Sequence, residues 1–266
     1  MSQFLISFCR LLLTHSSGIA YDAVHPGLLR WRKSRGEKPS AGVTVATRFL
    51  YPLVFEPGTS WTYGAGHDWA GKMVERVNPS MTLETYFEKY IWQPLGIKDM
   101  TFFIEGRPDL KAKKAGMSIR KAPDEKAMPY DGPIPYEGVK DCMGGQGLSA
   151  CAPEYLKVIH SLLADDGNLL KKEGAAELFT PQLTELSHKA LMKLSKIPDL
   201  NNLFGATLPI DCEKDWGLGG LLCLNHIPGW RSKETMTWTG LPNLCWVLPR
   251  FSSHIEHMTD WMLLVY

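Results

Sequence analysis

The six cysteines of this 266-residue chain form no C-x-x-C pair and no other metal-binding spacing. Such scattered thiols make a poor disulfide framework, which favours reduced and mostly buried cysteines in a cytosolic protein. The run His254-Ile255-Glu256-His257 also lacks the H-E-x-x-H spacing of a zinc site. We therefore expect no metal, no cofactor and a cytoplasmic location.

The chain has little net charge and no long apolar run. A formal charge of +1 argues against electrostatic recognition of nucleic acid or of an anionic membrane. No window approaches the roughly 18 uncharged apolar residues that a membrane span needs. The apolar stretch at 4–13 is interrupted by Arg10 and has no small-residue cleavage site, so it is better interpreted as a helix than as a signal peptide.

What the sequence does contain is enough apolar material, 44% of its residues, to bury the core of one large domain or two interleaved lobes. Residue spacing and turn signals predict an α+β arrangement, with helices first and antiparallel strands last. Residues 19–60 are predicted to be loop-rich. Helices are predicted at 68–77, 82–92, 153–165 and from 171 towards 181, and strands at 101–104, 115–120, 216–224 and 235–240.

The segment Phe55–Gly71 places a single tyrosine, Tyr63, on a glycine-flanked turn directly before a predicted helix. A tyrosine held in this way, with its hydroxyl aimed into a cleft, can move a proton for a serine nucleophile. The alternative is a core tyrosine whose hydroxyl is satisfied by a neighbour.

Five short motifs in a fixed order carry a resemblance to a known family. They are Leu12–Gly18 (L-L-T-H-S-S-G), Phe55–Tyr63, Trp92–Phe102 (W-Q-P-L-G-I-K-D-M-T-F), Gly144–Ala150 (G-G-Q-G-L-S-A) and Trp238–Asn243 (W-T-G-L-P-N). Each is weak alone, but together they are specific. The chain resembles the serine β-lactamase and penicillin-binding-like superfamily, in its class C and esterase branch, and is most similar to fungal polyketide transesterases.

The resemblance implies a β-lactamase/transpeptidase-like fold with a helical lobe and a partial antiparallel sheet. It implies that Tyr63 is catalytic, and that Trp238, Thr239, Gly240 and Leu241 form the oxyanion and substrate-binding strand, with the Leu241 N–H as a donor. Relatives carry His or Lys where Trp238 stands, and a tryptophan suits an apolar acyl chain better than the carboxylate of a β-lactam. Ala65 replaces an asparagine of the family pattern, which also favours an ester or thioester substrate.

The family nucleophile is a serine in S-x-x-K, upstream of the L-L-T-H turn. The only S-x-x-K here begins at Ser118, downstream of Tyr63, and we interpret it as a solvated strand or hairpin. We therefore expect no nucleophile, and a domain at 1–249 that is truncated at both ends. A tail at 250–266 has no family counterpart. Strand edges exposed in this way would favour aggregation.

Two functional interpretations stay open. The first is a serine hydrolase or acyltransferase of secondary metabolism that acts on a small ester or thioester through an acyl-enzyme, with an acyl carrier or coenzyme A as a candidate donor. The second is an inactive fragment or pseudoenzyme that at most binds an acyl ligand. Arg231 and Lys233 are candidate donor contacts, although a plain surface loop explains them better. Asp68 and Trp69 either belong to the active-site helix or are explained by capping and core packing. The glycines of 144–147 are expected to form a tight turn beside the site.

Overall fold

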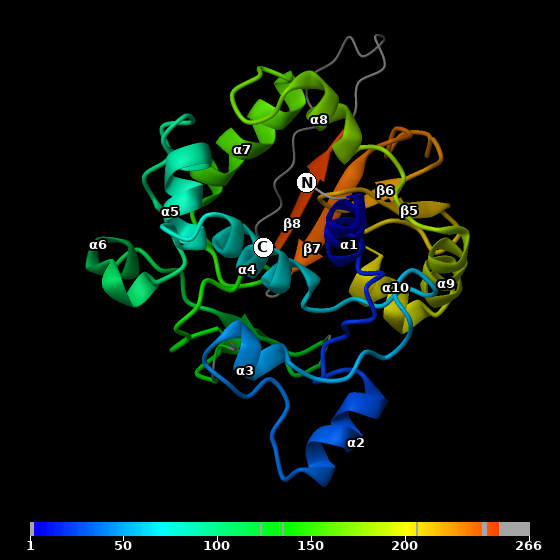
Figure 1. Cartoon of the computed structure of the whole chain (residues 1–266), viewed down its shortest axis with the longest axis horizontal. Coiled ribbons are helices and arrows are strands. Elements are labelled where there is room, and N and C mark those ends of the chain that lie inside the picture. The colour runs from blue at the N-terminus through cyan, green and yellow to red at the C-terminus, as the bar shows by residue number, and fades with distance from the viewer. Residues whose placement is uncertain are drawn as a thin grey trace.

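The α+β arrangement expected from the sequence is confirmed by the computed structural model, which describes residues 3–122, 124–132, 134, 136–205, 207–240 and 244–249. Figure 1 shows the main sheet with helices around it, and α2 and α3 at the end of the molecule away from the sheet. The helices are α1 (Gln3–Leu13), α2 (Pro26–Ser34), α3 (Val45–Phe49), α4 (Gly66–Val77), α5 (Leu83–Phe87), η1 (Glu88–Trp92), η2 (Ile104–Gly106), α6 (Pro108–Lys111), α7 (Ala152–Ala164), α8 (Lys172–Leu178), α9 (Glu185–Ser195) and α10 (Pro198–Phe204).

The main sheet has the order β5-β6-β7-β8, and each neighbouring pair of strands is antiparallel. Two small antiparallel pairs, β1 with β4 and β2 with β3, lie outside it. The strands are β1 (Met100–Thr101), β2 (Ser118–Ile119), β3 (Met128–Pro129), β4 (Ser149–Ala150), β5 (Lys214–Trp216), β6 (Leu221–Cys223), β7 (Met236–Gly240) and β8 (Leu244–Leu248). Sequential strands thus pair with each other in the main sheet, as in a meander.

The helix after the tyrosine turn, α4, begins two residues earlier than the sequence predicts. Asp68 lies in its first turn and Arg76 in its last, which places each charge at the favourable end of the helix dipole. Its buried residues are Gly66, Asp68 and Gly71. A side chain at Gly66 would have its Cβ 2.1 Å from the carbonyl oxygen of Leu12, so the absence of a side chain lets α4 pack closely on the end of α1.

The prediction of a loop-rich segment at 19–60 is wrong in part, because it contains α2 and α3. The helix α2 buries only Leu28 and Arg32, and the Arg32 Nε donates to the buried Asp22 carboxylate at 2.8 Å. Arg32 also pairs with Glu37 at 2.7 Å, and a helix stabilised by ion pairs shows no apolar stripe in its sequence. The five-residue helix α3 depends instead on a capping box between Thr44 and Thr47.

Three other predicted elements differ in their boundaries. The helix predicted at 82–92 is α5 followed by the π-helical η1, and the segment 101–104 leads from β1 into η2. The strand predicted at 216–224 is two strands, because the Gly217 N–H donates to the Gly220 carbonyl at 2.8 Å and closes a turn between β5 and β6. The helices α9 and α10 lie in the segment 182–213, for which the sequence predicts no element.

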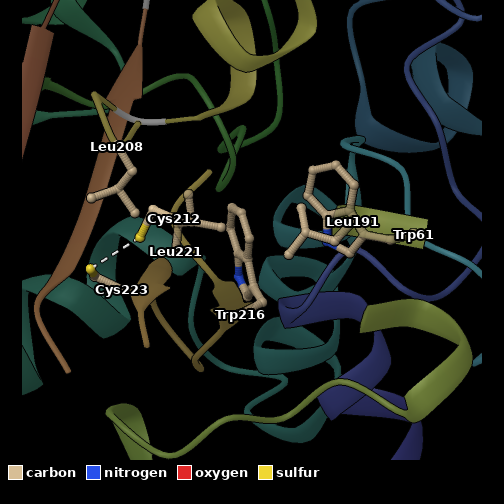
Figure 2. Packing of buried hydrophobic residues seen from close by; sticks show 7 residues of the cluster. All are labelled: Trp61, Leu191, Leu208, Cys212, Trp216, Leu221 and Cys223. Atoms are coloured by element: carbon tan, nitrogen blue, oxygen red, sulfur yellow. Dashed lines mark hydrogen bonds between the residues drawn. The ribbon is translucent and has the colours of Figure 1, made fainter. Parts of the chain in front are cut away.

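The largest core cluster joins α9 and the tyrosine turn to the edge of the sheet (Figure 2). Its buried members are Trp61, Leu191, Leu208, Cys212, Trp216, Leu221 and Cys223. Tyr63 and Trp238 are among the half-buried residues that pack against it. None of the helices in the described part of the chain combines the length and apolar character that a bilayer crossing requires.

Candidate active site

The turn that carries Tyr63 is held on both sides by one residue of the L-L-T-H segment. The Thr62 N–H donates to the His15 carbonyl at 3.1 Å, and the Gly64 N–H donates to the His15 Nδ1 at 3.3 Å. His15 itself is buried and has a φ of 57°, which turns its backbone and ring towards the same segment. These contacts fix the backbone immediately before and after Tyr63.

Position 64 of this turn has no space for a side chain, so it requires glycine. A Cβ built there would lie 1.9 Å from the carbonyl oxygen of Ile19 and 2.8 Å from the Cα of Ala20. Both are backbone atoms, so no flexible side chain can yield. The tyrosine turn and the chain at 19–20 therefore touch through their backbones, which fixes where the Tyr63 ring leaves the turn.

The Tyr63 ring packs among aromatic rings from distant parts of the sequence. Its centroid lies 4.5 Å from His15, 5.0 Å from Trp238, 5.5 Å from Tyr21 and 5.5 Å from Phe204. The Trp238 ring in turn lies 4.7 Å from Trp216, with its plane at 70°, a favourable edge-to-face arrangement. The structure therefore brings together Tyr63 and Trp238, two residues from separate motifs of the sequence.

The environment keeps the Tyr63 phenol protonated. Burial is the largest effect and raises the pKa of Tyr63, a hydrogen bond with Trp238 lowers it, and the charge of Asp68 raises it again. A phenol of raised pKa is neutral at pH 7 and can donate its proton to a leaving group. To act as a base, it would need a nearby cation that favours the phenolate.

Two histidines beside the tyrosine are also uncharged. Burial lowers the pKa of His67 to about 4 and brings the pKa of His15 well below its usual range. Their rings lie 4.9 Å apart, and His67 further lowers the pKa of His15. The rings that contact Tyr63 are thus uncharged, and they suit an apolar acyl group better than an anion.

The W-T-G segment forms the end of β7 and pairs with β8, with Trp238 opposite Trp246, Thr239 opposite Cys245 and Gly240 opposite Leu244. On its other side, β7 pairs with β6 only at Met236 and Thr237. From Trp238 to Gly240, β7 therefore extends beyond Leu221, the first residue of β6. Leu241, the expected oxyanion donor, lies outside the described residues.

The glycine-rich turn lies against the start of α4, beside the tyrosine, as the sequence analysis expected. The Gly145 N–H donates to the Asp68 Oδ1 at 3.2 Å. A Cβ at Gly144 would lie 2.8 Å from the His67 carbonyl oxygen, and one at Gly145 would lie 2.6 Å from the Asp68 Oδ2. Of the two alternatives for Asp68, these contacts support a packing role, because the buried carboxylate holds the turn on the helix.

The same burial predicts an unusual pH dependence of stability for Asp68. Desolvation raises its pKa from 3.8 to about 6. Between these values the native state keeps a proton that the unfolded state has lost, so this group makes stability fall as the pH rises through the window. Asp68→Asn keeps the acceptor for Gly145 and is expected to be more stable than the parent at pH 7, by on the order of 2 kcal/mol.

Urea denaturation of both proteins at pH 3 and pH 7 measures this difference. The gain should be present at pH 7 and absent at pH 3, where the parent carboxyl is protonated in both states. An equal difference at the two pH values would show that Asp68 does not titrate in this way.

Two other candidate residues, Ser118 and Arg231, lie on a hairpin and in a turn. Ser118 lies on β2, in an exposed two-stranded hairpin with β3, as the sequence analysis expected for a chance S-x-x-K. Arg231 follows the exposed Trp230 in a turn closed by the bridge between Ile227 and Arg231. Among the described residues, no group of three His, Cys, Asp or Glu side chains is placed to hold a metal ion.

His15, Trp216 and Phe204 contact the ring of Tyr63 or Trp238. None of the three was a candidate site residue from the sequence. His15 stands inside the quoted motif Leu12–Gly18, and that membership was the available signal. Trp216 and Phe204 carried no signal, because their proximity to Tyr63 depends on how β5 and α10 pack.

A helical lobe beside an antiparallel sheet, with a tyrosine turn packed against the W-T-G strand, is the arrangement of β-lactamase and penicillin-binding-like proteins. The chain belongs to the beta-lactamase family, whose model matches residues 9–240.

Its relatives include fungal acyltransferases and esterases. The chain is 38% identical over 242 residues to the monacolin J acid methylbutanoyltransferase of Aspergillus terreus, covering 89% of this chain and 57% of that protein. It is 36% identical over 250 residues to the lovastatin esterase of Penicillium rubens, covering 91% and 60%. A mutant of simvastatin synthase from Aspergillus terreus matches its structure with a TM-score of 0.81 and 39% identity, covering 91% of this chain and 58% of that one.

These similarities place the chain in a lineage of acyltransferases and esterases of secondary metabolism. The chain spans less than two thirds of the length of the relatives it matches.

Proposed function

We propose that this chain binds the acyl group of a small ester or thioester between Tyr63 and Trp238. These two residues would form the acyl-binding part of a β-lactamase-family active site. The observation that carries the proposal is the 5.0 Å contact between these two rings. It joins two motifs that occupy the tyrosine and substrate-strand positions of the family. The uncharged aromatic rings around Tyr63 and the relatives named as methylbutanoyltransferase and esterase support an uncharged acyl group.

In this proposal each residue has a distinct role. The Tyr63 phenol, neutral because its pKa is raised, donates its proton to the departing oxygen or sulfur. Trp238 packs on the acyl chain. The backbone N–H of Leu241, which follows Thr239 and Gly240 in sequence, is the proposed donor to the carbonyl oxygen, as an oxyanion hole requires. An acyl carrier or a coenzyme A thioester is the proposed donor.

The acyl group must move side chains to reach this position. Two surface hollows, one lined by residues that include Leu156 and His160 and the other by residues that include Lys72 and Phe103, do not include Tyr63. Tyr63 and Trp238 are each half-buried, so both are reachable from solvent. Binding would require the Trp238 ring to open from Tyr63, because the two rings now fill the space between them.

The nucleophile of an acyl-enzyme is not assigned within these 266 residues. Ser118, in their only S-x-x-K, is exposed on a hairpin, whereas a serine nucleophile needs a base and a held position. A fluorophosphonate probe is therefore expected to leave the chain unlabelled and the chain to bind a thioester without turnover. A labelled peptide containing Ser118 would overturn this part of the proposal.

Binding can be tested separately with a methylbutanoyl thioester of N-acetylcysteamine and titration calorimetry. Trp238→Ala is expected to weaken the affinity at least about tenfold, since it removes the aromatic surface under the acyl chain. Tyr63→Phe keeps the ring and should change the affinity by less than about threefold, or roughly 0.7 kcal/mol.

Trp230→Ala is the matched control, because Trp230 is 49% exposed and lies outside the proposed site. Its affinity should equal that of the parent chain. Binding that is absent in the parent, or that survives Trp238→Ala unchanged, would contradict the proposed acyl site.

A further inference from the structure

Two cysteines at the edge of the main sheet lie in direct contact. The Sγ atoms of Cys212 and Cys223 are 3.3 Å apart (Figure 2). Cys223 ends β6 opposite Lys214 of β5, and Cys212 comes two residues before Lys214. The antiparallel pairing of β5 with β6 thus brings two residues 11 positions apart in sequence to the same point.

The contacts of these thiols favour a reactive sulfur. The hydrogen bond between the two sulfurs lowers the pKa of Cys223, whose Sγ also lies 3.0 Å from the Asn225 carbonyl oxygen. The fully buried Lys214 lies beside them, with its Nζ donating to the Pro209 carbonyl at 2.6 Å and to the Cys212 carbonyl at 3.2 Å. An ammonium and an S–H donor next to a thiol both favour the thiolate, which is the nucleophilic form.

We infer that Cys212 and Cys223 form a reversible disulfide when the chain meets a small hydroperoxide. The Cys223 thiolate attacks one peroxide oxygen, takes up a hydroxyl as a sulfenic acid and releases the second oxygen as water after protonation. The Cys212 sulfur then attacks the sulfenic sulfur and displaces a second water. Overall, two thiols and one hydrogen peroxide give one disulfide and two waters, and the two sulfurs lose two electrons. A dithiol reductant reverses the reaction.

The disulfide would form inside the core cluster against which Tyr63 packs. Both cysteines belong to the buried cluster that contains Trp61 and Trp216, and Tyr63 packs against that cluster. Disulfide formation would tie the segment before β5 to the end of β6, which restricts the unfolded chain and is expected to raise the melting temperature by several degrees.

Hydrogen peroxide treatment of the purified chain, followed by alkylation under denaturing conditions and peptide mapping, tests the inference. The number of alkylated cysteines should fall by two from six, and a cross-linked peptide should join Cys212 to Cys223. Dithiothreitol should restore both thiols. Phenylarsine oxide, which bridges neighbouring dithiols, should bind the untreated chain and block the cross-link.

Cys151 provides the matched control, because it is exposed and lies at the start of α7. Cys151→Ser should leave the cross-link intact, whereas Cys212→Ser and Cys223→Ser should each abolish it. Arsenical binding to the unaltered chain decides the question if a serine variant fails to fold. Free thiols at both positions after peroxide, or separate oxidation of each without a cross-link, would overturn the inference.

Discussion

Gly64→Ala is expected to lower the free energy of unfolding by more than about 3 kcal/mol, within the range of severe core substitutions. The new Cβ would lie 1.9 Å from the Ile19 carbonyl oxygen and 2.7 Å from the Ile19 carbonyl carbon. These atoms are backbone, and Gly64 is buried. The alanine therefore forces the tyrosine turn away from the chain at 19–20 and breaks the contacts of His15 with it. Urea denaturation followed by circular dichroism measures the loss.

Gly116→Ala is the control for this substitution. A Cβ at Gly116 would meet no atom within 4 Å, and its φ is not positive. The variant should unfold within about 0.5 kcal/mol of the parent chain, as exposed substitutions usually do. If Gly64→Ala were equally mild, the tyrosine turn would not lie against Ile19, and the proposed placement of Tyr63 would be wrong.

Trp216→Ala is expected to cost about 3–5 kcal/mol of stability, the usual range for removing a large buried aromatic side chain. Trp216 is 1% exposed, and its ring lies 4.8 Å from His15, 5.6 Å from Trp61 and 4.7 Å from Trp238. The cavity would open beneath the candidate site itself. Chemical denaturation gives the stability, and the near-ultraviolet circular dichroism spectrum reports the loss of fixed ring packing.

Trp230→Ala removes the same side chain from an exposed turn, where it is 49% exposed. Its cost should stay below about 1 kcal/mol. Trp216→Phe should fall between the two variants, since it retains part of the ring contacts. Equal stabilities of Trp216→Ala and Trp230→Ala would show that the cluster around Trp216 is not packed as described.

The sequence predicts those elements whose signals are local. The helix α4 follows a glycine-flanked turn and α7 begins with Pro153 in its first turn, so both appear near their predicted positions. The helix α9 also had a local signal, Thr184, whose side chain accepts from the Ser187 N–H, and a complete search for caps would have found it. By contrast, α2 depends on the ion pair of Arg32 with Asp22, which spacing alone does not reveal.

Some residues of the candidate site could be predicted from sequence motifs, and others are brought there only by packing. Tyr63 and Trp238 were selected because they stand in motifs with a fixed order, and the structure brings their rings together. The proximity of Trp216 and Phe204 depends on the packing of β5 and α10 against the tyrosine turn. His15 accepts hydrogen bonds from the residues on both sides of Tyr63, with its own backbone at positive φ. Few non-glycine residues adopt this conformation, and the sequence does not predict it.

Intermolecular nuclear Overhauser effects from a bound methylbutanoyl thioester test the central proposal most directly. With selectively labelled tyrosine and tryptophan, the acyl methyl groups should give cross-peaks to the Tyr63 ring and to the Trp238 indole, and Trp238→Ala should remove the second set. Cross-peaks confined to residues of the β2–β3 hairpin, or to neither ring, would contradict an acyl site between the tyrosine turn and the W-T-G strand.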